Sequence, residues 1–154
     1  MQANKGVPRY PLAMDAVIWV QGPISGLPSA GTNRIPNGHD AFLNEFIGIN
    51  PGSVSWHNFD TDAHFLSLVP GWSAPATSSQ ADINPTEIGT NRIAGTNDVP
   101  GGDTITLLFN KPGLYYYYCA THAGIDAATH RASAIKDASE YPIPMEGFVL
   151  VVGS

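Results

Sequence analysis

The chain contains a single cysteine, Cys119, which ends the run Tyr115–Tyr118 and is followed three residues later by His122. A lone cysteine cannot form a disulfide within its own chain, so it is a buried thiol, a nucleophile or a metal ligand. Thiolate sulfur and imidazole nitrogen are ligands that suit copper in both oxidation states. Cys119 and His122 therefore predict a mononuclear copper site, provided that a second histidine reaches them.

His57 is the histidine that we expect to complete the site. It follows the strand-like segment 53–56 and precedes Asn58. Two imidazoles and one thiolate in a plane, with a weak axial group, suit a metal that cycles between two oxidation states. Structural zinc uses the same ligand types, but it normally takes four firm ligands. The ligand set therefore favours copper over structural zinc.

Taken together, His57-Asn58, Cys119-x-x-His122 and Met145-Glu146-Gly147 resemble the cupredoxin family of type 1 (blue) copper proteins. The resemblance covers about residues 46–69 and 103–154. It implies an antiparallel Greek-key β-sandwich or barrel. It also implies that Asn58 braces the cysteine loop by hydrogen bonds and that Met145 is a weak axial ligand.

Met145 departs from the family pattern, because 22 residues lie between His122 and Met145. In the common sites the axial methionine follows the loop histidine by about five residues. The axial position is therefore filled by Met145, filled by water, or empty. His130, further along the same loop, is the alternative to His122, because nitrite reductases of this family place that histidine further from the cysteine.

The stretch around Asp60 and His64 resembles the domains of copper nitrite reductase, and single domains of that kind are the nearest likeness. Asp60 and His64 are catalytic candidates if the protein is an enzyme. The expected function is one-electron transfer with a partner protein or a small redox molecule. The alternative is a copper-dependent oxidoreductase that acts on nitric oxide or nitrite through an open axial position. A homotrimer would accompany this alternative.

The composition excludes several other classes of protein. Charged residues make up 13% of the 154 residues, the net charge is −6, and only 7 residues are Lys or Arg, so the clustered cations of a nucleic-acid-binding protein are missing. No run reaches the roughly 18 apolar residues of a membrane span. The N-terminus lacks the apolar core of a signal peptide. The family resemblance nevertheless implies an extracytoplasmic protein, periplasmic or secreted, from which the leader has been removed.

Short strands separated by turns are expected along the whole chain, which we interpret as one domain over residues 1–154. Sixteen glycines and 13 prolines favour turns over helices. The turn signal at residues 110–113 predicts a hairpin between its two flanking strands. The alanine-rich segment 126–136, with Asp126 as N-cap, predicts a short helix between the Cys-His loop and the last strand. The strand-like runs are residues 16–20, 46–49, 53–56, 64–69, 104–109, 114–119 and 147–152.

Overall fold

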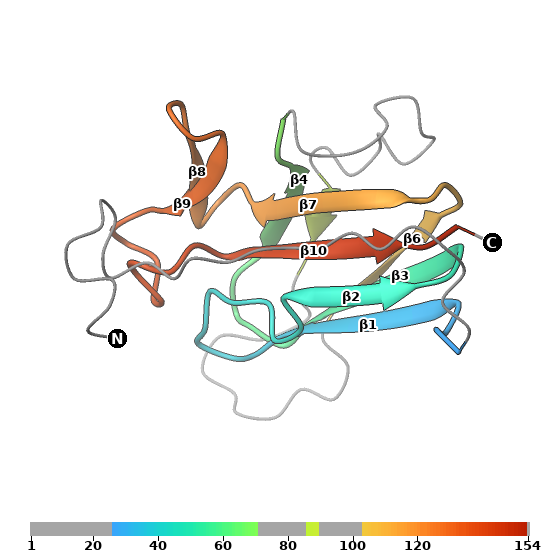
Figure 1. Cartoon of the computed structure of the whole chain (residues 1–154). Coiled ribbons are helices and arrows are strands. Elements are labelled where there is room, and N and C mark those ends of the chain that lie inside the picture. Colours follow the sequence, from blue (N-terminus) through green and yellow to red (C-terminus); the bar gives the residue numbers. More distant parts are fainter. Residues whose placement is uncertain (1–25, 71–85, 90–102, 154) are drawn as a thin grey trace, which may run out of the picture.

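The computed structural model describes residues 26–70, 86–89 and 103–153. Within these residues the chain forms strands and no helix, arranged as a sandwich of two main sheets with a small additional hairpin (Figure 1). The predicted all-β sandwich is therefore confirmed. The strands are β1 (Ala30–Ile35), β2 (Phe46–Ile49), β3 (Gly52–Asn58), β4 (His64–Leu68), β5 (Thr86–Ile88), β6 (Thr104–Phe109), β7 (Gly113–Cys119), β8 (Ala123–Asp126), β9 (Arg131–Ala134) and β10 (Glu146–Val151).

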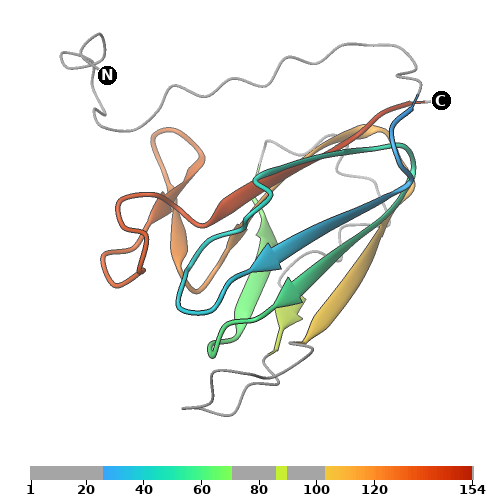
Figure 2. The same ribbon diagram turned by 90° about the horizontal axis from the view of Figure 1, so that it is seen from below.

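The first sheet has the strand order β1-β3-β6, and the second has the order β2-β10-β7-β4-β5. Figure 2 shows β1, β3 and β6 side by side in one layer. Most neighbours are antiparallel, but β1 pairs with β3 and β2 pairs with β10 in parallel. The expectation of an entirely antiparallel sandwich is corrected at these two edges. A parallel pair needs a long connection between its strands. Between β1 and β3 the connection includes β2, which belongs to the other sheet.

The turn at residues 110–113 does not make a hairpin, contrary to the prediction. β6 pairs with β3 in one sheet, whereas β7 pairs with β10 and β4 in the other. The turn therefore carries the chain across the sandwich. The Tyr115 hydroxyl donates a hydrogen bond to the Lys111 carbonyl at 3.0 Å, which holds the start of β7 against this turn. Turn residues specify a reversal of the chain, but they do not specify which strand edges will pair.

Large aromatic side chains from both sheets fill the space between the sheets. Trp56 of β3 packs edge-on against Tyr117 of β7, with ring centroids 5.4 Å apart, and Phe109 of β6 packs against Tyr115 at 5.1 Å. Alternation along β3 sends every second residue inward. Asn33 of β1 is also buried and donates a hydrogen bond to the Tyr117 hydroxyl at 2.9 Å, which ties the sheets together within the core.

The segment 126–136, predicted as a helix, forms instead the turn and second strand of the hairpin β8–β9, which projects beyond the end of β7 (Figure 1). The Asp126 carboxylate accepts hydrogen bonds from the N–H groups of Ala128 and Thr129, both at 2.9 Å, and His130 closes the turn with a φ of 52°. A helix N-cap binds the same N–H groups, so the local signal is ambiguous. Pairing between β8 and β9 decides the outcome in favour of a turn.

Strands β1 and β5 form outside the runs that were expected to be strands. The strand predicted over residues 16–20 lies outside the described residues. In the part of the chain that the structure describes, no helix is long and apolar enough to cross a membrane.

Candidate metal centre

The centre is built at one end of the second sheet, where β4 begins beside the end of β7. Leu66 of β4 pairs with Cys119 of β7, and the Phe65 N–H donates a hydrogen bond to the Cys119 sulfur at 3.4 Å. His64 opens β4 on the inward face, so its side chain lies in the same buried layer as Cys119. The chain then turns after β7, with the His122 N–H bonded to the Cys119 carbonyl at 3.2 Å, and this turn brings His122 back over the sulfur.

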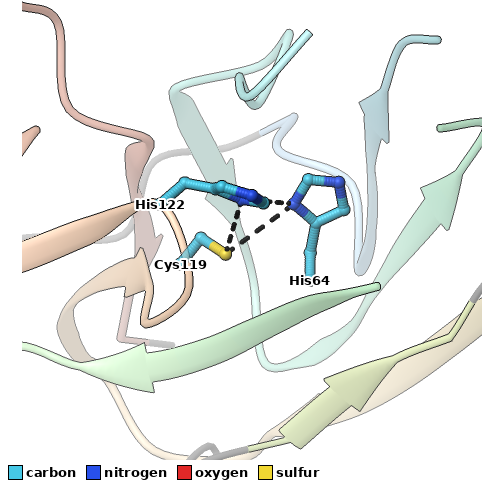
Figure 3. A group of neighbouring side chains, drawn as sticks. All are labelled: His64, Cys119 and His122. Carbon is cyan, nitrogen blue, oxygen red and sulfur yellow. Dashed lines mark hydrogen bonds between the residues drawn. The ribbon is translucent and has the colours of Figure 1, made fainter. Parts of the chain in front are cut away.

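The side chains of His64, Cys119 and His122 point toward one another (Figure 3). The Cys119 Sγ lies 3.7 Å from His64 Nδ1 and 3.5 Å from His122 Nδ1, and the two Nδ1 atoms are 3.1 Å apart. Cys119 and His64 are fully buried, and the His122 side chain is 12% exposed. The two rings and the thiol thus form a closed cluster that only His122 connects to the surface.

The structure corrects the prediction that His57 supplies the first imidazole. Alternation along β3 turns Val54 and Trp56 inward and places His57 on the outer face of the first sheet. There, His57 Nδ1 is hydrogen-bonded to Thr104 Oγ1 on β6 at 2.9 Å. His64, which the sequence suggested only for an enzymatic site, occupies the position expected of His57. The signal was present in the sequence, because the apolar alternation of β3 already assigned His57 to the polar face.

Met145 immediately precedes β10 and lies beside Cys119. The pairing of Glu146 with Tyr118 continues to Met145 and Cys119, and the Cys119 N–H donates to the Met145 carbonyl at 2.9 Å. Opposite residues of an antiparallel pair share a face of the sheet. Met145 is 1% exposed and belongs to the same hydrophobic core as Cys119. The sheet register therefore brings the methionine to the centre despite the long insertion.

Asn58 braces a different loop from the one predicted. Its amide donates hydrogen bonds to the carbonyls of Asp62 and Gly89, at 2.7 and 2.9 Å, and its side-chain oxygen accepts the Asp60 N–H at 2.8 Å. These bonds shape the turn that leads into His64, and not the cysteine loop. His130, the alternative to His122, is exposed in the β8–β9 turn and is not part of the cluster.

The cluster stabilises a thiolate at Cys119. Burial alone would raise the pKa of the thiol, but hydrogen bonds from His122 and His64, with the N–H groups of Phe65 and Thr121, outweigh it and lower the pKa to about 5. The pKa of His122 is raised, mainly by its hydrogen bond to Cys119 and against the effect of burial. A thiolate beside imidazoles is the form of cysteine that binds a metal.

The opposite edges of both imidazoles face carboxylates. His64 Nε2 is 3.3 Å from an oxygen of Asp60, and His122 Nε2 is 3.3 Å from an oxygen of Asp40. Neither aspartate was assigned this place from the sequence: Asp60 was a catalytic candidate, and Asp40 was not singled out. Nothing in the local pattern marks Asp40, because the loop containing it comes from between β1 and β2.

The donor set fits copper. Ligand bonds of about 2.0 Å to nitrogen and 2.3 Å to sulfur place the donor atoms of one metal roughly 3.3 to 3.8 Å apart, and the three distances here range from 3.1 to 3.7 Å. In the metal-free protein the Nδ1–H groups of His122 and His64 bind the thiolate. A bound metal would replace these protons, because a neutral imidazole whose Nε2–H faces a carboxylate offers the metal its Nδ1 lone pair. Three buried donor atoms that converge in this way favour a bound cation. Two imidazoles, a thiolate and an adjacent thioether form the set that is typical of copper electron-transfer sites.

No protein-family model matches the chain, and no curated protein matches it. Solved cupredoxin structures are similar to it. The purple cupredoxin from Nitrosopumilus maritimus aligns over 79% of this chain and 98% of its own, with 19% identity and a TM-score of 0.40. Amicyanin from Paracoccus versutus aligns over 79% of this chain and 80% of its own, with 17% identity and a TM-score of 0.43. At this level of similarity, the metal assignment depends on the donor atoms described above.

Proposed function

We propose that this chain is a cupredoxin-type copper protein that transfers single electrons. The observation that carries the proposal is the buried convergence of Cys119 Sγ, His64 Nδ1 and His122 Nδ1 within 3.1 to 3.7 Å. Met145 supplies a thioether as the weak axial group. When bound, copper supplies a one-electron couple.

The residues of the centre have different roles in electron transfer. His64 and Cys119 are fully buried and exclude water from the centre. They are held by strands β4 and β7, so the donor atoms keep one arrangement in both oxidation states. The His122 side chain is 12% exposed, so its ring connects the centre to solvent. An electron donor or acceptor therefore docks over the His122 ring, and the partner is a redox protein or a small redox molecule.

The enzymatic alternative required an open axial position on the copper, with Asp60 or His64 beside it. His64 instead faces Cys119, and Asp60 is hydrogen-bonded to the far side of the same imidazole. Among the described residues the remaining histidines, His39, His57 and His130, lie outside the cluster. We therefore favour electron transfer over turnover of nitric oxide or nitrite. An extracytoplasmic location, a nitrite-reductase-like lineage and a trimeric assembly stay predictions from the sequence.

The decisive test compares His64→Ala with His57→Ala after addition of one equivalent of Cu(II). We expect an intense thiolate-to-copper absorption band in the wild type and in His57→Ala, because His57 lies on the outer face of the first sheet. His64→Ala should lose the band, and its copper affinity should fall by on the order of a hundredfold or more, since even residues that only support metal ligands are worth 10- to 100-fold.

Cys119→Ser is the control for the origin of the band, because it removes the sulfur and keeps a small polar side chain. A wild-type protein with only weak absorption would disprove the copper assignment and leave a structural thiol or a zinc site. Loss of the band in His57→Ala with its retention in His64→Ala would restore the original sequence prediction.

A further inference from the structure

Each imidazole of the centre has its Nδ1 atom toward Cys119 and its Nε2 atom toward a carboxylate. Asp60 lies behind His64, and both side chains are almost fully buried, at 4% and 0% exposure. Asp40 lies behind His122, at 10% and 12% exposure. The two aspartates come from different parts of the fold, because Asp60 precedes β4 and Asp40 belongs to the loop between β1 and β2. Two separate segments of the chain therefore form the same kind of imidazole–carboxylate contact.

Backbone N–H groups fix both carboxylates in place. One oxygen of Asp60 accepts hydrogen bonds from the N–H groups of Gly38 and Thr61, at 2.8 and 2.7 Å, and its other oxygen faces His64. One oxygen of Asp40 accepts the Ser139 N–H at 2.5 Å, and its other oxygen faces His122. The Asp40 N–H in turn donates to the Ser139 hydroxyl at 2.8 Å. Each carboxylate therefore uses one oxygen for its own orientation and the other for an imidazole.

We propose that Asp40 and Asp60 are positioning residues that hold the proton of each imidazole on Nε2, leave Nδ1 free to bind the metal, and lower the reduction potential of the centre. This inference rests on the proposed copper function. The ring nitrogen that carries the proton is set by the hydrogen bond at that nitrogen, and a carboxylate accepts only from N–H. When a metal replaces the protons that the rings share with Cys119, both Nδ1 lone pairs are then available to it.

The charge of the two aspartates gives this arrangement a redox consequence. Each carboxylate lies one imidazole ring away from the metal position, in a region of low solvent exposure, where charge interactions are weakly screened. A negative charge favours the more positive oxidation state of the metal. Removing one carboxylate charge while keeping its shape should therefore make the centre easier to reduce.

Asp40→Asn and Asp60→Asn test the electrostatic part, with Asp62→Asn as the matched control. Asp62 is exposed and acts on the His122 ring through space, without a hydrogen bond to it in the described part of the chain. We expect the equilibrium constant for reduction by a fixed one-electron reagent to rise about tenfold in Asp40→Asn and Asp60→Asn, which is 59 mV for one electron. Asp62→Asn should change this constant by less than about threefold.

Asp40→Ala tests the positioning part by nuclear magnetic resonance of the Cu(I)-loaded, diamagnetic protein. The wild type and Asp40→Asn should show a slowly exchanging Nε2–H proton on His122, because either side chain offers an oxygen acceptor. Asp40→Ala should lose this signal. If Asp40 were needed only for folding, asparagine would not keep the Nε2–H signal while changing the equilibrium constant for reduction.

The outcomes separate the two proposals. A wild-type protein without the thiolate-to-copper band overturns both. A wild-type band together with asparagine variants whose reduction constants stay within about twofold of the wild type overturns the inference and leaves the function standing. An Asp62→Asn effect as large as that of Asp40→Asn also overturns it, because the contacts would then not matter. If Asp60→Asn fails to fold, Asp40→Asn decides the question, since its loop lies at the surface.

Discussion

At the scale of single residues, the unusual chemistry of this protein lies in the thiol of Cys119. Two imidazoles and two backbone N–H groups lower its pKa from an ordinary value of 9.0 to about 5, against the effect of burial. The copper-free protein therefore holds a thiolate at neutral pH. We expect the ultraviolet absorbance of the thiolate to titrate with a midpoint near pH 5, and His122→Gln to move that midpoint upward.

The same shift predicts how the stability of the copper-free protein depends on pH. The folded pKa of Cys119 is depressed, so its contribution is present above the unfolded pKa and is lost as the pH falls through about 5. The folded pKa of His122 is raised above 6.5, so its contribution is present below 6.5 and is lost as the pH rises through the folded value. Between about pH 5 and 6.5 the unfolded chain binds one more proton than the folded pair.

Stability should therefore rise with pH across that window and then level off above pH 6.5, where both states hold one proton on the pair. Denaturant titrations at several pH values measure this, with Cys119→Ser as the control that removes the rise. A stability that falls between pH 5 and 6.5 would contradict the ion-pair interpretation.

The sequence predicted Cys119, His122 and the place of Met145, because each stands beside its strand. It misplaced the first imidazole, because His57-Asn58 matches the family pattern of the electron-transfer ligand, whereas His64 matches only the stretch of an enzymatic site. The inward and outward alternation of β3 was the physical signal that separates the two histidines. Asp40 could not be found from the sequence at all, since its contact with His122 depends on the path of a loop 82 residues earlier in the chain.

At the scale of elements, the fit between β7 and β10 depends on a glycine. Gly147 pairs with Tyr117, and a Cβ at residue 147 would lie 2.5 Å from the Tyr117 hydroxyl and 2.6 Å from the adjacent ring carbon. That hydroxyl accepts the bond from Asn33 of the opposite sheet. A methyl group there would push the ring away from its partner and loosen the contact between the sheets.

We expect Gly147→Ala to reduce the free energy of unfolding by about 1–3 kcal/mol, as for other overpacked positions. Gly124→Ala in β8 is the matched control, because a Cβ there meets nothing within 4 Å, and its effect should stay within about 0.5 kcal/mol. Urea denaturation measures both. Equal effects would show that loss of glycine freedom, and not the Tyr117 contact, decides the cost.

Prediction of the elements succeeded where the local pattern and the sheet agreed. The alternating runs of β2, β3, β4, β6, β7 and β10 were expected, and each forms. The helix predicted for the alanine-rich segment does not form. The prediction was wrong because Asp126 makes the same side-chain hydrogen bonds in a turn as in a helix N-cap. β1 was not expected as a strand, because its residues are mixed polar and apolar, and its pairing with β3 makes it one.

At the scale of the whole molecule, a sandwich could be predicted but its pairing could not. Short alternating strands and many turns specify two apolar faces that must cover one another. They do not specify that β6 and β7 lie in different sheets, or that β1 and β2 pair in parallel with their neighbours. Those choices depend on contacts between distant segments, such as Trp56 with Tyr117.

The net charge of −6 gives the last prediction. Near the only exposed ligand, His122, lie the carboxylates of Asp40 and Asp62, and Glu140 is hydrogen-bonded to His39 in the loop that carries Asp40. A cationic reagent should therefore reduce or oxidise the copper-loaded protein faster than an anionic reagent of equal driving force, because the field raises its local concentration.

The rates should converge between 0.01 and 0.1 M salt, where the Debye length falls from about 30 to about 10 Å. Glu140→Gln should slow the cationic reagent at low salt. Lys111→Gln is the distal control: it increases the net negative charge at the turn before β7, at the opposite end of that strand from Cys119, and should hardly change the ratio of the two rates. Stopped-flow mixing measures the rate of each reagent with each of the three proteins. Rate changes of equal size and opposite direction in the two variants would mean that total charge controls the encounter. A response confined to Glu140 would place electron entry at the surface around His122.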